Sequence, residues 1–342
     1  MQPLARPAGL DSQDCEVPAD ALRRAAVRAA WAPSVHNTQP WQFVLGHRRL
    51  QIRADLARQL PVLDPGGRQL LISCGCAVFN ARVSLAFDGF AAEVVLYARG
   101  EHGSLIADLT GEPSGDHNLA ALDPVLELRR TNRRPFADDR VADELVATLR
   151  AAASAEEASL FAIEDQPHRI AVAELSQQAE AVEEADPAYR AELRAWVTDD
   201  QRRGDGVSIA TLPRLDRAAS DDGRPMNGLP LRTYADPGEA GLPGGTLANR
   251  DQSLFLLGTE GDDPVSWIRA GQALERVWLE VTRAGYAMSL CTQLIEVPAT
   301  RALVRAELGL GMYPHILLRV GRAPATPASR RRKLVEVLSH AR

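Results

Sequence analysis

Long hydrophobic runs are missing from this chain of 342 residues. No stretch of 18 uncharged apolar residues occurs, so we expect no membrane-spanning helix and no membrane partner. The N-terminal residues 1–10 also lack the apolar core of a secretory signal. Together these absences predict a cytoplasmic protein.

Cysteine is scarce, and its spacing is wrong for a metal site. The chain has four cysteines, at positions 15, 74, 76 and 291, with no CxxC pair and no histidine at metal-site spacing. Cys74 and Cys76 lie two apart in an expected helix, where their side chains point to different faces. We therefore expect buried, reduced thiols and no metal.

An excess of positive charge is also lacking. The net charge of −6 argues against a general nucleic-acid binder, and a composition of 45% hydrophobic and 25% charged residues is ordinary for a soluble globular protein. The arginines are nevertheless clustered, at 129–134 and at 330–332. Such clusters fit either a bound anion, such as a phosphate, or solvated surface charge.

Apolar periodicity predicts a chain of mixed helices and strands. Helices are expected over residues 20–31, 68–88, 143–153, 169–184, 188–196, 266–284 and 299–308, and strands over 41–45, 50–52, 93–97, 160–163, 254–257 and 316–320. The helix at 68–88 is apolar nearly all round and should be central. Residues 199–250 are rich in Gly, Pro, Asp and Arg, which fits either a covering lid or a disordered insertion.

The two long helices match without gaps when the sequence is shifted by 196 positions. Gly75 then pairs with Gly271 and Gly89 with Gly285, with apolar residues matched between them. An early glycine lets a helix approach a neighbouring backbone closely. Both helices are expected to lead to a strand, the second after an inserted short helix. The repeat favours a pseudo-twofold dimer within one chain.

A polar segment with the sequence APSVHNTQPW occupies residues 32–41, between a helix and a strand. Its prolines fix the backbone shape. Ser34, Asn37 and Gln39 can donate and accept hydrogen bonds, as a heteroaromatic ring with carbonyls and ring nitrogens requires. His36 could donate near such a ring, although a lone histidine in a polar turn is more often structural. A capped polar turn without a ligand is the alternative.

A basic segment with the sequence ELRRTNRRPF occupies residues 127–136. Arg129 and Arg133 lie four apart, and Thr131 adds a hydroxyl between them. Arginine offers planar, bidentate donors suited to a phosphate. The triplet at 330–332 could add cations to the same anion, and by itself it indicates the basic start of a C-terminal helix.

These strings resemble the FMN-dependent nitroreductases. The first resembles their APS-x-x-N-x-QPW segment, and RRTNR at 129–133 resembles their RRS-x-R phosphate-binding segment, with Thr131 in place of serine. The strings SVHNTQPW, LDPGGR and RRTNRRPF, with the run from Leu257 to Arg276, resemble the Acg-type nitroreductase-like proteins. The matches extend from about residue 20 to 335. The first string is specific, whereas the arginine string would be weak alone.

The resemblance implies an α+β fold in which two fused half-repeats, 1–125 and 126–342, form an intramolecular pseudo-dimer with one composite FMN site. It therefore implies a monomer in solution. Residues 288–291 correspond to the family loop whose backbone approaches flavin N5. The implied cofactor contacts are Pro33, Ser34, Asn37, Gln39, Arg129, Arg130, Thr131, Arg133, Ser289, Leu290, Cys291, Arg331 and Arg332.

The activity implied by the resemblance is reduction of a nitro or quinone-like acceptor by NAD(P)H, with FMN carrying the chemistry and no catalytic side chain required. The sequence departs from the family in three ways. The order of the two segments is reversed and neither is duplicated, and residues 199–250 have no counterpart in small nitroreductases. If that stretch covers the flavin, the protein would hold FMN without turnover, which is the alternative function.

Overall fold

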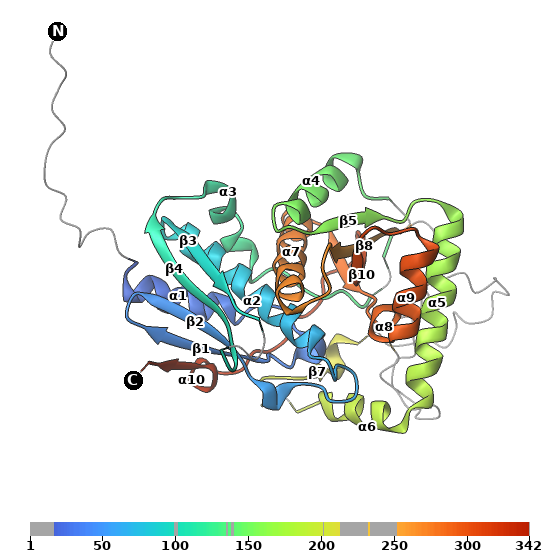
Figure 1. Cartoon of the computed structure of the whole chain (residues 1–342), viewed down its shortest axis with the longest axis horizontal. Helices are drawn as coiled ribbons and strands as arrows, with labels where there is room; N and C mark the ends of the chain where they lie inside the picture. Colours follow the sequence, from blue (N-terminus) through green and yellow to red (C-terminus); the bar gives the residue numbers. More distant parts are fainter. Residues whose placement is uncertain are drawn as a thin grey trace, which may run out of the picture.

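Two sheets lie on either side of a pair of long helices in the computed structural model (Figure 1). The structure describes residues 17–98, 102–134, 136–137, 140–200, 202–212, 232 and 252–341. Cys15 and most of the stretch 199–250 lie outside the described residues, so the prediction of a lid is not tested there.

The first sheet has five strands and the second has four. The first has the order β11 (Leu338–His340), β1 (Trp41–Gly46), β2 (Arg49–Ala54), β4 (Leu105–Pro113) and β3 (Phe90–Leu96). The second has the order β5 (Ser159–Ala162), β8 (Ser253–Thr259), β10 (Tyr313–Gly321) and β9 (Ala287–Leu290). A small pair joins β6 (Val197–Thr198) to β7 (Val207–Ser208).

The α-helices are α1 (Ala19–Ala29), α2 (Arg68–Phe87), α3 (His117–Ala120), α4 (Asp143–Ser154), α5 (Gln166–Ala185), α6 (Pro187–Trp196), α7 (Pro264–Arg283), α8 (Gln293–Glu296), α9 (Pro298–Glu307) and α10 (Leu334–Val337). Short 3-10 turns are η1 (Val35–Asn37), η2 (Leu56–Arg58), η3 (Asp123–Val125) and η4 (Ile209–Thr211). The mixed helix and strand content agrees with the predicted α+β class.

Helices α2 and α7 cross at the two matched glycines. A Cβ on Gly75 would lie 2.1 Å from the Ile268 carbonyl oxygen, and one on Gly271 would lie 2.0 Å from the Ile72 carbonyl oxygen. The contact is reciprocal under the shift of 196 positions, as expected when equivalent surfaces meet. The glycines that follow the helices, Gly89 and Gly285, also share a left-handed conformation, with φ of +87° and +76°.

Helix α2 lies in the core, as its apolar sequence predicts. It is buried along nearly its whole length and packs against α7. It is the one described helix long and apolar enough to cross a membrane, although none was expected. Its burial within the protein accounts for that composition.

Several elements were not predicted from the sequence or were predicted in the wrong place. Strands β4, β9 and β11 and helix α3 were not expected. Strand β9 comes directly after α7, and the expected short helix and strand follow it as α9 and β10. Residues 330–332 do not begin a helix, because α10 starts at Leu334.

The C-terminal tail crosses back to the first sheet, where β11 pairs in parallel with β1 (Figure 1). Phe43 on β1 faces Leu338 on β11 in this pairing. The tail between β10 and β11 therefore runs beside the loop that precedes β1. This return brings residues 329–332 to the polar segment 32–41.

Candidate functional site

The polar loop before β1 has an unusual backbone. His36, Asn37 and Gln39 adopt positive φ values of 48°, 56° and 50°. Non-glycine residues reach this region rarely, and a cluster of them persists only where surrounding contacts hold it. The Ser34 hydroxyl helps to hold this backbone by accepting a hydrogen bond of 2.9 Å from the backbone amide of Gln39.

Side chains of the same loop tie together two distant segments. The Asn37 amide donates to the Gly206 carbonyl at 3.0 Å, and the Gln39 amide donates to the Gly204 carbonyl at 2.9 Å. The Gln39 side-chain oxygen accepts from the Arg332 backbone amide at 2.8 Å. Gln39 and Arg332, both predicted to contact the cofactor, thus brace the loop and stand outside the walls of the two cavities described below.

The basic segment runs along the free edge of β9. Thr131 forms a parallel bridge with Met288, and the Asn132 amide donates to the Met288 carbonyl at 2.8 Å. Because β9 lies at the edge of its sheet, this pairing sets the arginine segment against residues 289–291. The structure thus brings together three of the strings that the sequence singled out.

A polar cavity of about 430 Å³, including its open mouth, lies where the loop, the basic segment and the C-terminal tail meet. The described residues that line it are Trp31, Pro33, Ser34, Asn37, Arg129, Arg130, Thr131, Arg133, Ser329 and Arg331. None of them is acidic. Four arginines therefore face one small space, as expected for a site that binds an anion.

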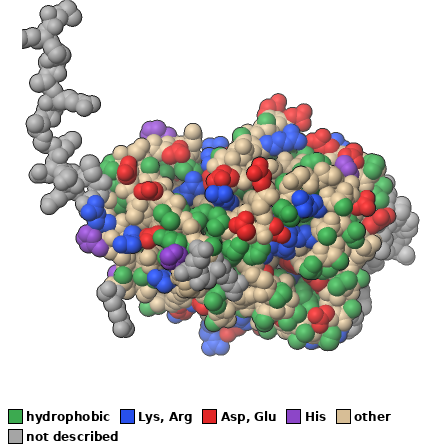
Figure 2. Space-filling model, in the orientation of Figure 1, with side chains coloured by type: hydrophobic (Ala, Val, Ile, Leu, Met, Phe, Trp, Pro, Cys, Tyr) green, Lys and Arg blue, Asp and Glu red, His purple; other side chains and the backbone are tan. Residues whose placement is uncertain are grey.

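The arginines of this cavity destabilise one another. Burial, and then the charge of Arg129, lower the pKa of Arg331 to about 9. The same two causes lower the pKa of Arg130. On the face shown in Figure 2, by contrast, acidic and basic side chains are interspersed over the surface. An anion in the cavity would offset the local excess of positive charge.

Arg129 is held in place from three sides. Its Nε lies 3.2 Å from Glu275 Oε1, and its guanidinium lies 4.6 Å from the centre of the Trp278 ring. It also donates to the Trp31 carbonyl at 3.1 Å. Both charged partners are almost fully buried, so the guanidinium is fixed before any ligand arrives.

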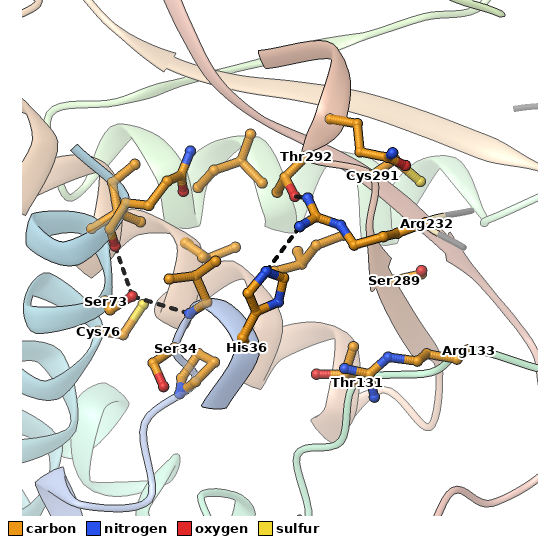
Figure 3. A pocket seen from close by; sticks show the side chains of 18 of the residues that line it. Ser34, His36, Ser73, Cys76, Thr131, Arg133, Arg232, Ser289, Cys291 and Thr292 are labelled. Atoms are coloured by element: carbon orange, nitrogen blue, oxygen red, sulfur yellow. Dashed lines mark hydrogen bonds between the residues drawn. The ribbon is translucent and has the colours of Figure 1, made fainter. Parts of the chain in front are cut away.

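A larger cavity of about 1070 Å³, including its open mouth, adjoins the polar one. The two share Pro33, Ser34, Thr131 and Arg133 in their walls. The described residues that line the larger cavity are Pro33, Ser34, Val35, His36, Gln69, Ile72, Ser73, Cys76, Thr131, Arg133, Leu212, Arg232, Leu274, Ser289, Leu290, Cys291, Thr292, Gln293 and Ile316 (Figure 3).

His36 lines the larger cavity in its neutral form. Burial, and then the charges of Arg232 and Arg133, hold its pKa well below the usual value. Its Nε2 lies 3.0 Å from an Arg232 nitrogen (Figure 3). Since arginine only donates, Nε2 is the acceptor and the ring proton is on Nδ1.

Arg232 brings the stretch 199–250 into the same cavity. It donates to the Thr292 hydroxyl at 3.3 Å and is ion-paired with Glu296. Leu212, from the start of the same stretch, also lines the cavity. Leu212 and Arg232 from this stretch are therefore part of the cavity wall.

Several site residues were missed at the level of sequence. Trp31, Glu275 and Trp278 shape the polar end, and Gln69 and Ser73 line the larger cavity. One usable signal was present, because Glu275 is an acidic residue at a core position of a long helix and so requires a partner. The identity of that partner could not be deduced.

The cysteines are buried and unpaired at positions 74, 76 and 291, as predicted. Burial raises the pKa of all three thiols. Among the described residues, no group of three or more His, Cys, Asp or Glu side chains is placed to hold a metal ion.

Known proteins resemble this chain along most of its length. It is 31% identical over 333 residues to the "Putative NAD(P)H nitroreductase acg" of Mycobacterium tuberculosis strain H37Rv, covering 95% of this chain and 97% of the relative. A second protein of that strain, described in the same words, is 32% identical over 326 residues, covering 94% and 91%. No family model matches the chain.

The fold can also be compared with solved structures. The nitroreductase with bound FMN from Desulfitobacterium hafniense DCB-2 is 12% identical and covers 63% of this chain and 96% of its own, with a TM-score of 0.39. An overlap as loose as this one carries no weight for the cofactor.

Proposed function

The chain belongs to the family of NAD(P)H nitroreductases that includes Acg, and from this premise we propose that it is an FMN-binding oxidoreductase that uses NAD(P)H to reduce a nitro or quinone-like acceptor. The observation that carries the proposal is the pair of adjoining cavities. One is small and cationic, and the other is larger and mainly uncharged. An elongated ligand with an anionic end and a flat polar ring matches that shape.

The residues present fit FMN by their chemistry. Arg129, Arg130, Arg133 and Arg331 supply the positive charge that a phosphate requires, and Thr131 adds a hydroxyl. No acidic side chain competes among the described lining residues of either cavity. Around the larger cavity, hydroxyl, amide and backbone groups can meet the edge of a ring system. A bound FMN would supply hydride transfer between NAD(P)H and an electron acceptor.

The residues of the chain would bind and orient the cofactor and would exclude water from it. Ile72, Leu274, Leu290 and Ile316 form apolar walls of the larger cavity. Residues 289–291, at the end of β9 and just beyond it, line the larger cavity, and Ser34 and Pro33 line both cavities. His36 is neutral there and adds no positive charge. We propose the cofactor contacts predicted from the sequence for these residues because the residues line the two cavities.

We also propose that the two halves are a fused pseudo-dimer. The reciprocal glycine contact between α2 and α7 supports this, because it repeats under the shift that aligns the two helices. If the twofold interface is already formed within one chain, the protein should be a monomer at micromolar concentration. Light scattering that gives the mass of two chains would contradict this part of the proposal.

A second candidate function is flavin holding without turnover. It is favoured by one observation, the presence of Leu212 and Arg232 from the stretch 199–250 in the cavity wall. An absorption spectrum recorded anaerobically with and without NADPH separates the two functions. A flavin band that bleaches on addition supports the reductase, and one that persists supports the holding function.

Removal of Arg129 tests the cofactor site itself. Arg129→Ala removes a buried cation of the polar cavity, so FMN affinity should fall by about 1.5–3 kcal/mol, or roughly 10- to 150-fold in the dissociation constant. Arg134 belongs to the same segment but lines neither cavity, so Arg134→Ala is the matched control and should bind normally. Equal affinity in the wild type and Arg129→Ala would contradict the phosphate assignment.

A further inference from the structure

Glu275 lies against Arg129, which lines the polar cavity. It lies on α7, is completely buried, and its Oε1 is 3.2 Å from Arg129 Nε. Neither carboxylate oxygen has a well-aligned hydrogen bond from a described residue. A buried carboxylate without such bonds depends on nearby positive charge for its ionisation.

We propose that Glu275 is a positioning residue that holds Arg129 ready for a phosphate and takes up a proton when the phosphate binds. This inference rests on the proposed function, since it assumes that the polar cavity receives the phosphate of FMN. The guanidinium of Arg129 would then lie between two anionic groups. The ligand would draw on the same positive charge that keeps Glu275 ionised.

The charged groups around Glu275 decide the direction of the effect. Arg129 faces it from the basic segment, Arg331 from the C-terminal tail and the Cys76 thiol from α2. Burial raises the pKa of Glu275 to about 7, although Arg129, the Asn80 amide and Arg331 act against that rise. Cys76 stays a neutral thiol, because burial raises its pKa well above the usual value.

A dianion bound to these arginines would raise the pKa of Glu275 further, because it repels a second negative charge. Binding therefore favours the protonated carboxyl, and the bound state holds more protons than the free state. By linkage, FMN affinity is highest below the free pKa of about 7 and falls as the pH rises through it. Ionisation of the ligand phosphate, with a pKa of about 6, is largely complete by pH 7 and does not produce this fall.

The size of the effect follows from the shift that the ligand causes. If binding raises the Glu275 pKa by about one unit, the dissociation constant should increase roughly threefold from pH 7 to pH 8. Uptake at pH 7.5 should be about half a proton per FMN. Arg331, with a pKa of about 9, keeps most of its charge over this range.

Isothermal titration of the wild-type protein tests the proposal. FMN is titrated at pH 7.5 in two buffers with different ionisation enthalpies, and its affinity is measured at pH 7 and pH 8. Riboflavin is the matched ligand, because it carries the same ring without the phosphate. We expect proton uptake and the threefold change with FMN and neither with riboflavin.

A variant assigns the proton to its residue. Glu275→Gln should bind FMN with the same affinity at pH 7 and pH 8 and without proton uptake. Glu280→Gln, on the same helix where Glu280 pairs with Arg283, should keep the wild-type behaviour. If Glu275→Gln does not fold, the wild-type titrations still overturn the proposal when FMN binds without proton uptake or when riboflavin gives equal uptake.

The outcomes separate this inference from the function on which it rests. FMN binding without proton uptake, or equal uptake with riboflavin, would overturn the role of Glu275 and leave FMN binding intact. Uptake that persists in Glu275→Gln would assign the proton to another group and would also overturn it. Failure of the wild type to bind FMN at either pH would overturn both proposals.

Discussion

Helices α2 and α7 cross at equivalent glycines, but one turn further along their chemistry differs. Phe79 on α2 occupies the position of Glu275 on α7, and Arg82 occupies that of Trp278. Phe79 is buried in an apolar cluster with residues of the segment 119–126. Glu275 and Trp278 instead enclose Arg129.

This difference would place the proposed cationic site beside α7 and not beside the matched turn of α2. A fused pair that kept both sites would need a buried acid and an aromatic ring on each helix. Only α7 has that combination at the matched positions, and Arg82 on α2 turns toward Glu156. The glycine contact that the two helices share therefore determines how they pack. The residues one turn further along α7 contribute to the proposed binding site.

The largest expected effect comes from the shared contact. Gly75→Ala and Gly271→Ala each place a Cβ about 2 Å from a backbone carbonyl oxygen of the other helix. Neither backbone can move without separating the helices, so each substitution should cost about 3 kcal/mol or more of unfolding free energy. The two costs should be nearly equal, as measured by denaturant unfolding.

Gly66→Ala is the control for this pair. Gly66 has no heavy atom within 4 Å of the added Cβ, so its cost should stay within about 0.5 kcal/mol. If one of the two helix glycines tolerated alanine and the other did not, the helices would not be equivalent. That result would also weaken the proposal of a fused pseudo-dimer.

The second effect belongs to α7 alone. Trp278 is 1% exposed and lies against the Arg129 guanidinium, so Trp278→Leu loses both buried area and the cation–π contact. Stability should fall by about 2–3 kcal/mol, and FMN should bind roughly tenfold more weakly because Arg129 is less restrained. Fluorescence titration on the folded variant measures the affinity. An unchanged affinity would show that Arg129 is positioned without Trp278.

Much of this arrangement could be predicted from local sequence. The long helices and most longer strands follow from periodicity, and the glycines at 75 and 271 indicate the close contact between α2 and α7. The strings at 32–41 and 129–133 carried the site through their resemblance to a family. The structure brings residues of both strings into the wall of one cavity.

The remainder depends on contacts between distant residues, which no local pattern encodes. Strand β11 has three residues, and it forms only by pairing with β1 almost the whole chain earlier. Strand β9 has four residues and lies at a sheet edge, so its pattern is too short to detect. Gln39 has the donor and acceptor groups that a ring requires, yet its side-chain amide donates to the carbonyl of residue 204 and its side-chain oxygen accepts from the backbone amide of residue 332.

The smallest effect belongs to α2 alone. Arg82 pairs with Glu156, which also receives Arg276 from α7 at 2.8 Å. Arg82→Leu leaves Glu156 with its second partner, so the loss of stability should be only about 1 kcal/mol. FMN affinity should not change, because Arg82 lines neither cavity. Trp278→Leu and Arg82→Leu alter matched positions on the two helices. A similar loss of FMN affinity in both variants would show that α2 and α7 contribute alike to FMN binding. The difference between the two halves would then lie outside these positions.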